Sequence, residues 1–158
     1  MRPATIGFLG VCVAILGGVR LSRASQDVPQ QIKHGTASWY SNASAKREGT
    51  CHVGKRGGCL TASGKELNDE AFTAASWDYS FGTLLTICRD QLSSNKSQAC
   101  IMVEVADRGP SKHLYRQGRL LDLSEKSFAA LADLKEGVIK ITVEAIPSLR
   151  RIELTEGK

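Results

Sequence analysis

Residues 138–146 alternate apolar and polar side chains, the pattern of a β-strand with one buried face. The expected buried face carries Ile139, Ile141, Val143 and Ala145. Residues 83–88 and 99–106 predict two more strands, joined by a polar connection into a hairpin. Residues 35–41 and 120–123 are shorter candidates. Five or six short strands favour a mainly β fold, a small closed barrel or a sandwich.

One short helix is expected near the C-terminal end of this domain. Ser124 is a good N-cap, and residues 125–136 carry apolar side chains at helical spacing until Gly137 ends the pattern. The polar stretches 42–58 and 111–119 are expected to be loops. Residues 25–34 indicate a flexible lead-in, residues 35–147 the single domain, and residues 148–158 a charged tail.

The first 24 residues have the features of a signal peptide. Arg2 gives a positive start, residues 4–19 are uncharged and mostly apolar, and Ser22 and Ala24 are small. The apolar run is shorter than the roughly 20 residues that cross a bilayer. We therefore expect cleavage after Ala24, export to the periplasm or the extracellular space, and no membrane span afterwards. The alternatives are an uncleaved anchor and lipidation at Cys12.

Four cysteines follow this leader, a number typical of two disulfides in a short exported chain. They are Cys51, Cys59, Cys88 and Cys100. Three pairings are possible. We favour a local Cys51–Cys59 bridge, and a Cys88–Cys100 bridge across the hairpin, where neighbouring strands bring Cα atoms to about 5.5 Å. Zinc is the competing interpretation, but the sequence has no CxxC pair and its three histidines are scattered, so no metal is expected.

The basic character of the chain comes partly from the leader. The whole chain has 21 basic and 16 acidic residues. Removing Arg2, Arg20 and Arg23 leaves 18 and 16, a net charge of +2. A nucleic-acid-binding domain needs a clustered basic face, and the sequence shows none, so we expect no nucleic-acid partner. We expect a monomer.

Four groups of residues, taken in order, resemble the rare lipoprotein A (RlpA) family. They are residues 37–40 (ASWY), 61–64 (TASG), 73–75 with 81–83 (TAA and FGT), and 107–110 (DRGP) followed by 121–124 (LDLS). The resemblance covers about residues 35–146. It implies a six-stranded double-psi β-barrel, related to expansin and barwin domains, and a role at the cell wall. Family members include lytic transglycosylases that act on peptidoglycan glycan strands, whereas expansin relatives bind and loosen wall polysaccharide without hydrolysing it.

Two carboxyls are candidate catalytic groups for such a reaction. A lytic transglycosylase protonates the glycosidic oxygen while the C6 hydroxyl of the same sugar attacks, so one carboxyl can act as acid and then as base. Asp107 is the first candidate because it lies where an apolar strand meets a loop, and the resemblance also implies a functional Asp there. Asp122, between two leucines, is the second. The structural alternatives are that Asp107 caps a turn and that Asp122 is a buried residue with a structural role, paired for example with Arg108.

Two positions depart from the family pattern. Relatives often carry Glu directly after the TASG-like turn, where this chain has Lys65 followed by Glu66, and His after TAA, where this chain has Ser76. In an extended segment a shift of one residue points the side chain to the opposite face. Glu66 therefore cannot be assumed to substitute. We keep Glu66 and Ser76 as candidate substrate-binding residues.

Further substrate-binding candidates are the loop aromatics, whose exposed rings can stack on sugars, and the arginine of DRGP. They are Trp77, Tyr79, Tyr115 and Arg108, and Tyr40 of the first expected strand is a further aromatic candidate. Trp39 and Phe81 are expected to pack inside the barrel.

The leading hypothesis is an exported lytic transglycosylase that uses Asp107 on peptidoglycan strands and needs no cofactor. The alternatives are a non-catalytic, expansin-like wall-binding module and a barwin-like protein acting on the wall of another organism.

Overall fold

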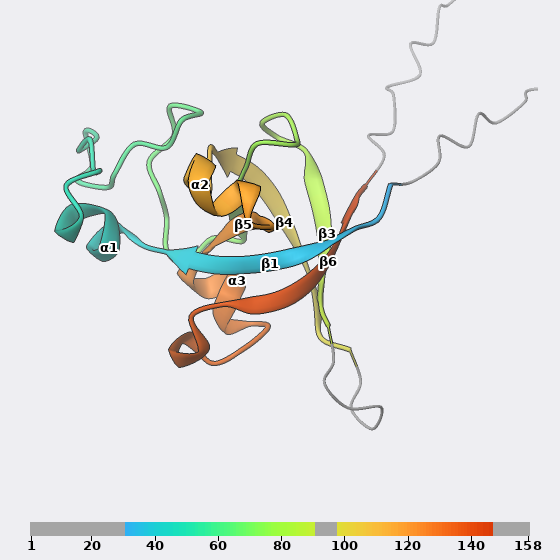
Figure 1. Cartoon of the computed structure of the whole chain (residues 1–158). Coiled ribbons are helices and arrows are strands. Elements are labelled where there is room, and N and C mark those ends of the chain that lie inside the picture. The colour runs from blue at the N-terminus through green and yellow to red at the C-terminus, as the bar shows by residue number, and fades with distance from the viewer. Residues whose placement is uncertain (1–30, 91–97, 147–158) are drawn as a thin grey trace, which may run out of the picture.

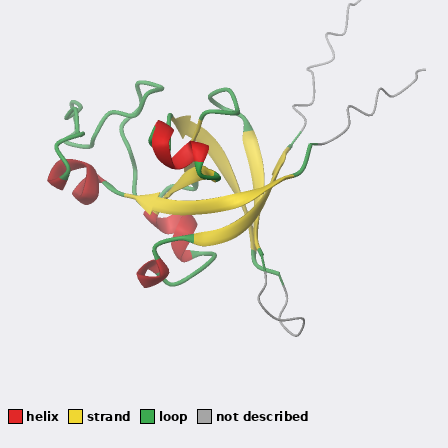
Figure 2. Ribbon diagram, in the orientation of Figure 1, coloured by secondary structure: helices red, strands yellow, loops and turns green. Residues whose placement is uncertain are grey.

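The structure is a computed structural model that describes residues 31–90 and 98–146, and six strands in it form a closed barrel (Figures 1 and 2). The strands are β1 (Lys33–Tyr40), β2 (Thr73–Ser76), β3 (Leu84–Arg89), β4 (Cys100–Asp107), β5 (Arg119–Ser124) and β6 (Ile139–Ala145). The expected six-stranded β-barrel is confirmed. The expected leader with Cys12, most of the lead-in and the charged tail lie outside the described residues.

The strand order around the barrel is β1-β5-β2-β4-β3-β6, and β6 closes the ring against β1. The pairs β1–β5 and β2–β4 are parallel, and each joins strands far apart in the sequence. The other four pairs are antiparallel, including the predicted β3–β4 hairpin. The crossed parallel pairs bring β1, β2, β4 and β5 side by side.

The barrel interior is filled by alternate side chains of all six strands and by α3 (Glu125–Ala129). The strand residues with the least exposure include Leu85, Ile87, Val103, Val105, Leu121, Leu123, Ile141 and Val143. Phe128 of α3 is fully buried against this core. The alternation predicted for residues 138–146 is confirmed, since Ile139, Ile141 and Val143 point inward and Lys140 outward.

The helices differ from the sequence prediction. Helix α1 (Asn42–Arg47) lies in an expected loop, where Ser41 and Ser44 form a reciprocal capping box. Helix α2 (Lys112–Arg116) lies in the other expected loop. The helix expected over residues 125–136 is wrong in length: α3 ends at Ala129, and a separate 3-10 turn, η1 (Leu134–Glu136), follows.

Two disulfides join Cys51 to Cys59 and Cys88 to Cys100, which confirms the favoured pairing. Cys88 and Cys100 are direct partners across the β3–β4 ladder. Strand β1 begins at Lys33, two residues earlier than expected, because residues 33–37 pair with β6. No helix among the described residues is long and apolar enough to cross a membrane.

Candidate functional site

A cleft of about 380 Å³ lies at one end of the barrel, where β1, β2 and β4 terminate. Tyr40, Ala75 and Asp107 contribute from these strand ends, and Asp122 contributes from β5. The facing wall is built by α1 and the loop that follows it, including Cys59, Leu60 and Thr61. The pairing of β2 with both β4 and β5 therefore brings both predicted catalytic aspartates to one cleft.

Asp107 and Asp122 flank the same residue of β2. Ala75 pairs with Asp107 on one side and with Asp122 on the other, so the two carboxyls leave the sheet on the same face. Gly109 lets the DRGP turn pass close to this pair, because an added Cβ would lie 3.1 Å from Cβ of Ala75 and 3.5 Å from Oδ2 of Asp122.

Asp107 is held in position by backbone groups. Its Oδ1 accepts hydrogen bonds of 2.7 Å from the N–H groups of Ala62 and Arg108. The bond from Ala62 ties the loop that follows Cys59 to the end of β4. The carboxyl is half-buried and still borders the cleft. Asp107 thus binds backbone N–H groups at the turn, and it also lines the cleft.

Asp122 has the electrostatics of a carboxyl that resists ionisation. Burial raises its pKa, and the nearby charges of Asp107 and Glu48 raise it further. The hydroxyl of Ser38 donates to Oδ1 of Asp122 at 2.5 Å, and this bond and the charge of Arg119 act in the opposite direction. Arg119 in turn donates to Oγ of Ser38 at 3.2 Å. The expected partner of Asp122 was Arg108, and the structure places Ser38 there instead.

Tyr40 is the last residue of β1 and lines the cleft together with both aspartates. Its hydroxyl is buried next to Asp107 and makes no hydrogen bond of good geometry among the described residues. Burial, followed by the charges of Asp107 and Asp122, raises the pKa of Tyr40 far above its usual range. The phenol therefore stays protonated and can donate its hydrogen to a carboxylate in the cleft.

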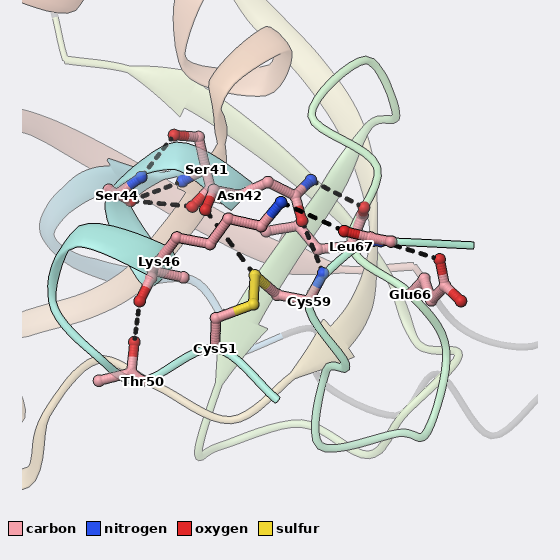
Figure 3. The surroundings of a disulfide bond; sticks show 12 residues. Ser41, Asn42, Ser44, Lys46, Thr50, Cys51, Cys59, Glu66 and Leu67 are labelled. Atoms are coloured by element: carbon pink, nitrogen blue, oxygen red, sulfur yellow. Dashed lines mark hydrogen bonds between the residues drawn. A yellow bond between two sulfur atoms is a disulfide. The ribbon is translucent and has the colours of Figure 1, made fainter. Parts of the chain in front are cut away.

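The outer wall of the cleft is braced by the Cys51–Cys59 disulfide and by Asn42 (Figure 3). The side-chain oxygen of Asn42 accepts from the N–H of Cys59 at 2.7 Å, and its Nδ2 donates to the carbonyl of Leu67 at 3.0 Å. These two hydrogen bonds fix the backbone at Cys59 and at Leu67 against the start of α1. The disulfide therefore closes this wall on itself, and the hydrogen bonds of Asn42 hold it against the start of α1.

Arg108 and Trp77 border the cleft but are already engaged. The guanidinium of Arg108 donates to the carbonyls of Ser76 and Tyr79 and lies 3.7 Å from the ring centroid of Phe81. The expectation that Phe81 packs inside the barrel is wrong, since its side chain is exposed beneath this guanidinium. Trp77 is 37% exposed, donates to the carbonyl of Pro110, and carries Nζ of Lys112 over its ring at 3.3 Å.

Four of the expected substrate-binding residues do not line the cleft. Ser76 is fully buried, and its hydroxyl accepts from the N–H of Asp78. Tyr115 donates a short hydrogen bond to Asp78, while Tyr79 packs against the core. Glu66 points into a separate hollow and accepts from the N–H groups of Arg56 and Gly58.

Sequence reasoning missed two polar groups that act on the carboxyls, Ser38 and Arg119. Ser38 was seen only as part of the ASWY segment, Arg119 lay in an expected loop, and Tyr40 was considered only as an aromatic ring for stacking on a sugar. A signal existed in the alternation of Ser38 and Tyr40 around Trp39, which predicts a shared face. No group of three or more potential metal ligands is found among residues 31–90 and 98–146.

Comparison with known proteins gives consistent matches along the chain. A family model described as lytic transglycolase matches residues 32–143. The chain is 33% identical over 135 residues to the probable endolytic peptidoglycan transglycosylase RlpA of Aquifex aeolicus, covering 83% of this chain and 50% of that protein. It is 30% identical over 131 residues to the endolytic peptidoglycan transglycosylase RlpA of Rickettsia typhi, covering 78% and 35%. The chain thus spans half or less of the length of these relatives.

A solved structure supports the fold. The apo expansin of Clavibacter michiganensis superposes with a TM-score of 0.51 at 24% identity, covering 75% of this chain and 52% of that one. At this identity the likeness concerns the barrel alone.

Proposed function

Because the chain belongs to the lytic transglycolase family of RlpA-like double-psi β-barrels, we propose that it is an exported lytic transglycosylase of peptidoglycan. It would cleave glycan strands and leave 1,6-anhydro-muramic ends. The observation that carries this proposal is the pair of carboxyls, Asp107 and Asp122, that flank Ala75 and face one cleft.

The proposed reaction needs one proton donor and one proton acceptor. The donor gives its proton to the glycosidic oxygen as the bond to C1 of the muramic sugar breaks. The C6 hydroxyl of that sugar then bonds to C1 and releases its proton to a carboxylate. Water does not enter, so the two carboxyls need not leave room for it as they do in an inverting glycosidase.

The surroundings of the two aspartates suit different halves of this reaction. The sequence favoured Asp107 as the general acid and base, and we now propose that Asp122 shares this role. Burial raises the pKa of Asp122, so this carboxyl is the better initial holder of the proton. Asp107, held by the N–H groups of Ala62 and Arg108, is placed to take the proton from the C6 hydroxyl and to stabilise positive charge at C1.

Tyr40 would act as a positioning residue for this pair. Its buried hydroxyl has no well-formed bond among the described residues and lies beside Asp107. A hydrogen bond formed with the substrate bound would orient the carboxylate toward the sugar. The exposed face of Trp77 would form one wall for a sugar ring, since its ring borders the cleft.

The test is product analysis by mass spectrometry. The protein, with both disulfides formed, is incubated with peptidoglycan strands, and new 1,6-anhydro ends are counted. Asp107→Asn and Asp122→Asn should each lower their formation by about 10²-fold or more, as expected for loss of a general acid or base. Glu144→Gln on the outer face of β6 is the matched control and should retain activity. A folded parent protein that forms no such ends would overturn the proposal.

A second candidate function is a wall-binding module without catalysis, and one observation favours it. The residue at the place where relatives carry His is Ser76, which is fully buried and hydrogen-bonded to the backbone of Asp78. The residues that line the cleft include no histidine. Binding of the parent protein to strands without new anhydro ends would support this second function.

A further inference from the structure

Besides the loop closed by the disulfide, the cleft is bordered by Trp77 and by residues 109–111, which lead into α2. We call these residues the tryptophan wall. Nε1 of Trp77 donates to the carbonyl of Pro110 at 2.6 Å, and Nζ of Lys112 in α2 lies 3.3 Å from the centroid of the Trp77 ring. The shape of the tryptophan wall therefore depends on where α2 lies.

Helix α2 has few means of its own to keep its position. It contains five residues, buries none of them, and receives no side-chain hydrogen bond at its N-cap, Ser111. A helix as short as this is unstable in isolation, because too few hydrogen bonds offset the entropy lost in forming the first turn. The position of α2 must therefore be set by contacts with other elements.

Asp78 connects α2 to the barrel. Its Oδ1 accepts a short hydrogen bond from the hydroxyl of Tyr115 in α2, and its Oδ2 accepts from Nζ of Lys33 at 2.9 Å. Lys33 is the first residue of β1 and pairs with Val143 of β6, so it belongs to the closed barrel. One carboxylate thus joins a weakly anchored helix to a firmly anchored strand.

The carboxylate of Asp78 is charged where it makes these contacts. Its side chain is only 14% exposed. Burial acts to raise the pKa of Asp78, but the hydrogen bonds from Tyr115 and Lys33 and the charge of Lys33 outweigh it, so the pKa lies below its usual value. Hydrogen bonds to an ionised group are stronger than those between neutral groups, so this contact can hold α2 in place.

The backbone next to Trp77 is held independently of α2. Asp78 follows Trp77 directly, and its N–H donates to Oγ of Ser76 at 3.2 Å. The guanidinium of Arg108 donates to the carbonyls of Ser76 and Tyr79 at 2.8 and 2.9 Å. The main chain at Trp77 is therefore fixed by residues 76–79 and Arg108, whereas the segment that packs against its ring is fixed through the Asp78 carboxylate.

We propose that Asp78 is a positioning residue that, through Tyr115 and Lys33, holds the tryptophan wall in the shape that receives a glycan strand. The identity of this ligand rests on the proposed function. Asp78 itself does not line the cleft, so it acts through the wall and not on the reacting atoms. Its loss should weaken the binding of strands and leave the chemical step nearly unchanged.

The test uses the protein with both disulfides formed and glycan strands stripped of stem peptides by an amidase. Asp78→Ala removes both side-chain bonds, Tyr115→Phe removes only the bond to α2, and Lys33→Met removes only the bond to the barrel. The matched control is Asp90→Ala, which removes another half-buried carboxylate, one that accepts from Thr142 at 2.7 Å and does not line the cleft.

Fluorine NMR of fluorotryptophan-labelled protein separates a local effect from a general one. The chain has two tryptophans, Trp39 and Trp77. Trp39 packs against the core and donates to the carbonyl of Leu134, so its resonance reports on the barrel. Asp78→Ala and Tyr115→Phe should shift or broaden the resonance of Trp77 and leave that of Trp39 in place.

Asp78→Ala and Tyr115→Phe should each raise KM about tenfold, as expected for loss of a hydrogen bond to a charged group. The Kd measured in the Asp107→Asn background, where strands are not consumed, should rise by the same factor. Lys33→Met should raise both about threefold, because its partly exposed ion pair is weaker. For all three variants kcat should stay within about twofold of the parent value, and Asp90→Ala should match the parent throughout.

An unchanged Kd in Asp78→Ala would overturn the inference, as would a loss of kcat at constant KM. Displacement of both tryptophan resonances would also overturn it, because the variant would then have disturbed the barrel and not the wall. A parent protein that binds strands without forming anhydro ends would overturn the proposed enzyme, and the Kd comparison would still decide the role of Asp78.

Discussion

Replacing Cys51 and Cys59 by alanine should separate the stability of the barrel from the shape of its cleft. The two cysteines are 8 residues apart, and Cys88 and Cys100 are 12 apart. Loop-closure entropy gives about 2.5 kcal/mol of stabilisation for the first bridge and about 2.8 kcal/mol for the second at 25 °C. Both double variants should therefore lose a similar part of the free energy of unfolding.

The two bridges differ in what they hold. Cys59 lines the cleft, and three residues later Ala62 donates the backbone N–H that fixes Asp107. The Cys88–Cys100 bridge joins β3 to β4 where their ladder ends, and neither cysteine lines the cleft. A small displacement of a group that positions a reacting carboxyl can lower the rate strongly. The Cys51 and Cys59 variant should therefore lose about tenfold or more in anhydro-product formation, and the Cys88 and Cys100 variant should keep near-parent activity.

Urea unfolding measures the free energy of unfolding, and its midpoint should fall by about 1–2 M in each variant. Product analysis under conditions where both variants are folded measures the rate of anhydro-product formation. Equal loss of activity in both variants would refute the local role of the Cys51–Cys59 bridge. Full activity in the Cys51 and Cys59 variant would refute it too, because the cleft wall would then hold its shape without the bridge.

Four other perturbations test the site and the core. Asp122→Asn should raise the free energy of unfolding at neutral pH, because a carboxyl whose pKa is raised on folding lowers stability once the pH exceeds its unfolded pKa. Melting curves from pH 3 to 8 should show the difference in stability between the variant and the parent growing with pH. Ser38→Ala removes the hydrogen bond that lowers the pKa of Asp122, so the alkaline limb of the pH–rate profile should move to higher pH; a shift to lower pH would contradict the role of Asp122 as acid. Tyr40→Phe should fold normally and lower kcat more than it changes KM, and unchanged kcat would exclude the phenol from positioning the carboxyls. Phe128→Ala should cost about 3–5 kcal/mol of stability, because Phe128 is fully buried in the core; calorimetry would measure this cost.

The strands and disulfides could be predicted because their signals are local. Alternation around Ile141 marks β6 within nine residues, and Cys88 and Cys100 are brought together by a hairpin between adjacent strands. Asp107 was chosen because it lies where an apolar strand meets a loop, and Asp122 because it lies between two leucines, and both line one cleft. These features depend on short-range pattern or on motif order.

The controlling contacts around the aspartates could not be predicted in the same way. Ser38 reaches Asp122 only because β1 and β5, more than 80 residues apart, pair in parallel with Ser38 opposite Asp122. No local pattern specifies that register. Phe81 was expected in the core, yet it lies outside beneath the guanidinium of Arg108, which donates to the carbonyls of Ser76 and Tyr79.

The short helices were missed because their stability comes from a few contacts and not from periodicity. Helix α1 buries no side chain and depends on the reciprocal bonds of Ser41 and Ser44. Helix α2 also buries none, and it is held by Tyr115 on Asp78 and by Lys112 on Trp77. Such helices carry little hydrophobic pattern for a sequence argument to find.

The pairing of β1 with β6 also decides how this domain can be joined to other parts of a protein. Lys33 lies opposite Val143, so the chain enters and leaves the barrel through neighbouring positions (Figure 1). The cleft begins at Tyr40, at the other end of β1, roughly 23 Å away along the strand. A partner domain fused before β1 or after β6 would therefore be tethered at the end remote from the cleft. A short linker between these positions should also permit circular permutation, with new termini opened in the β3–β4 connection.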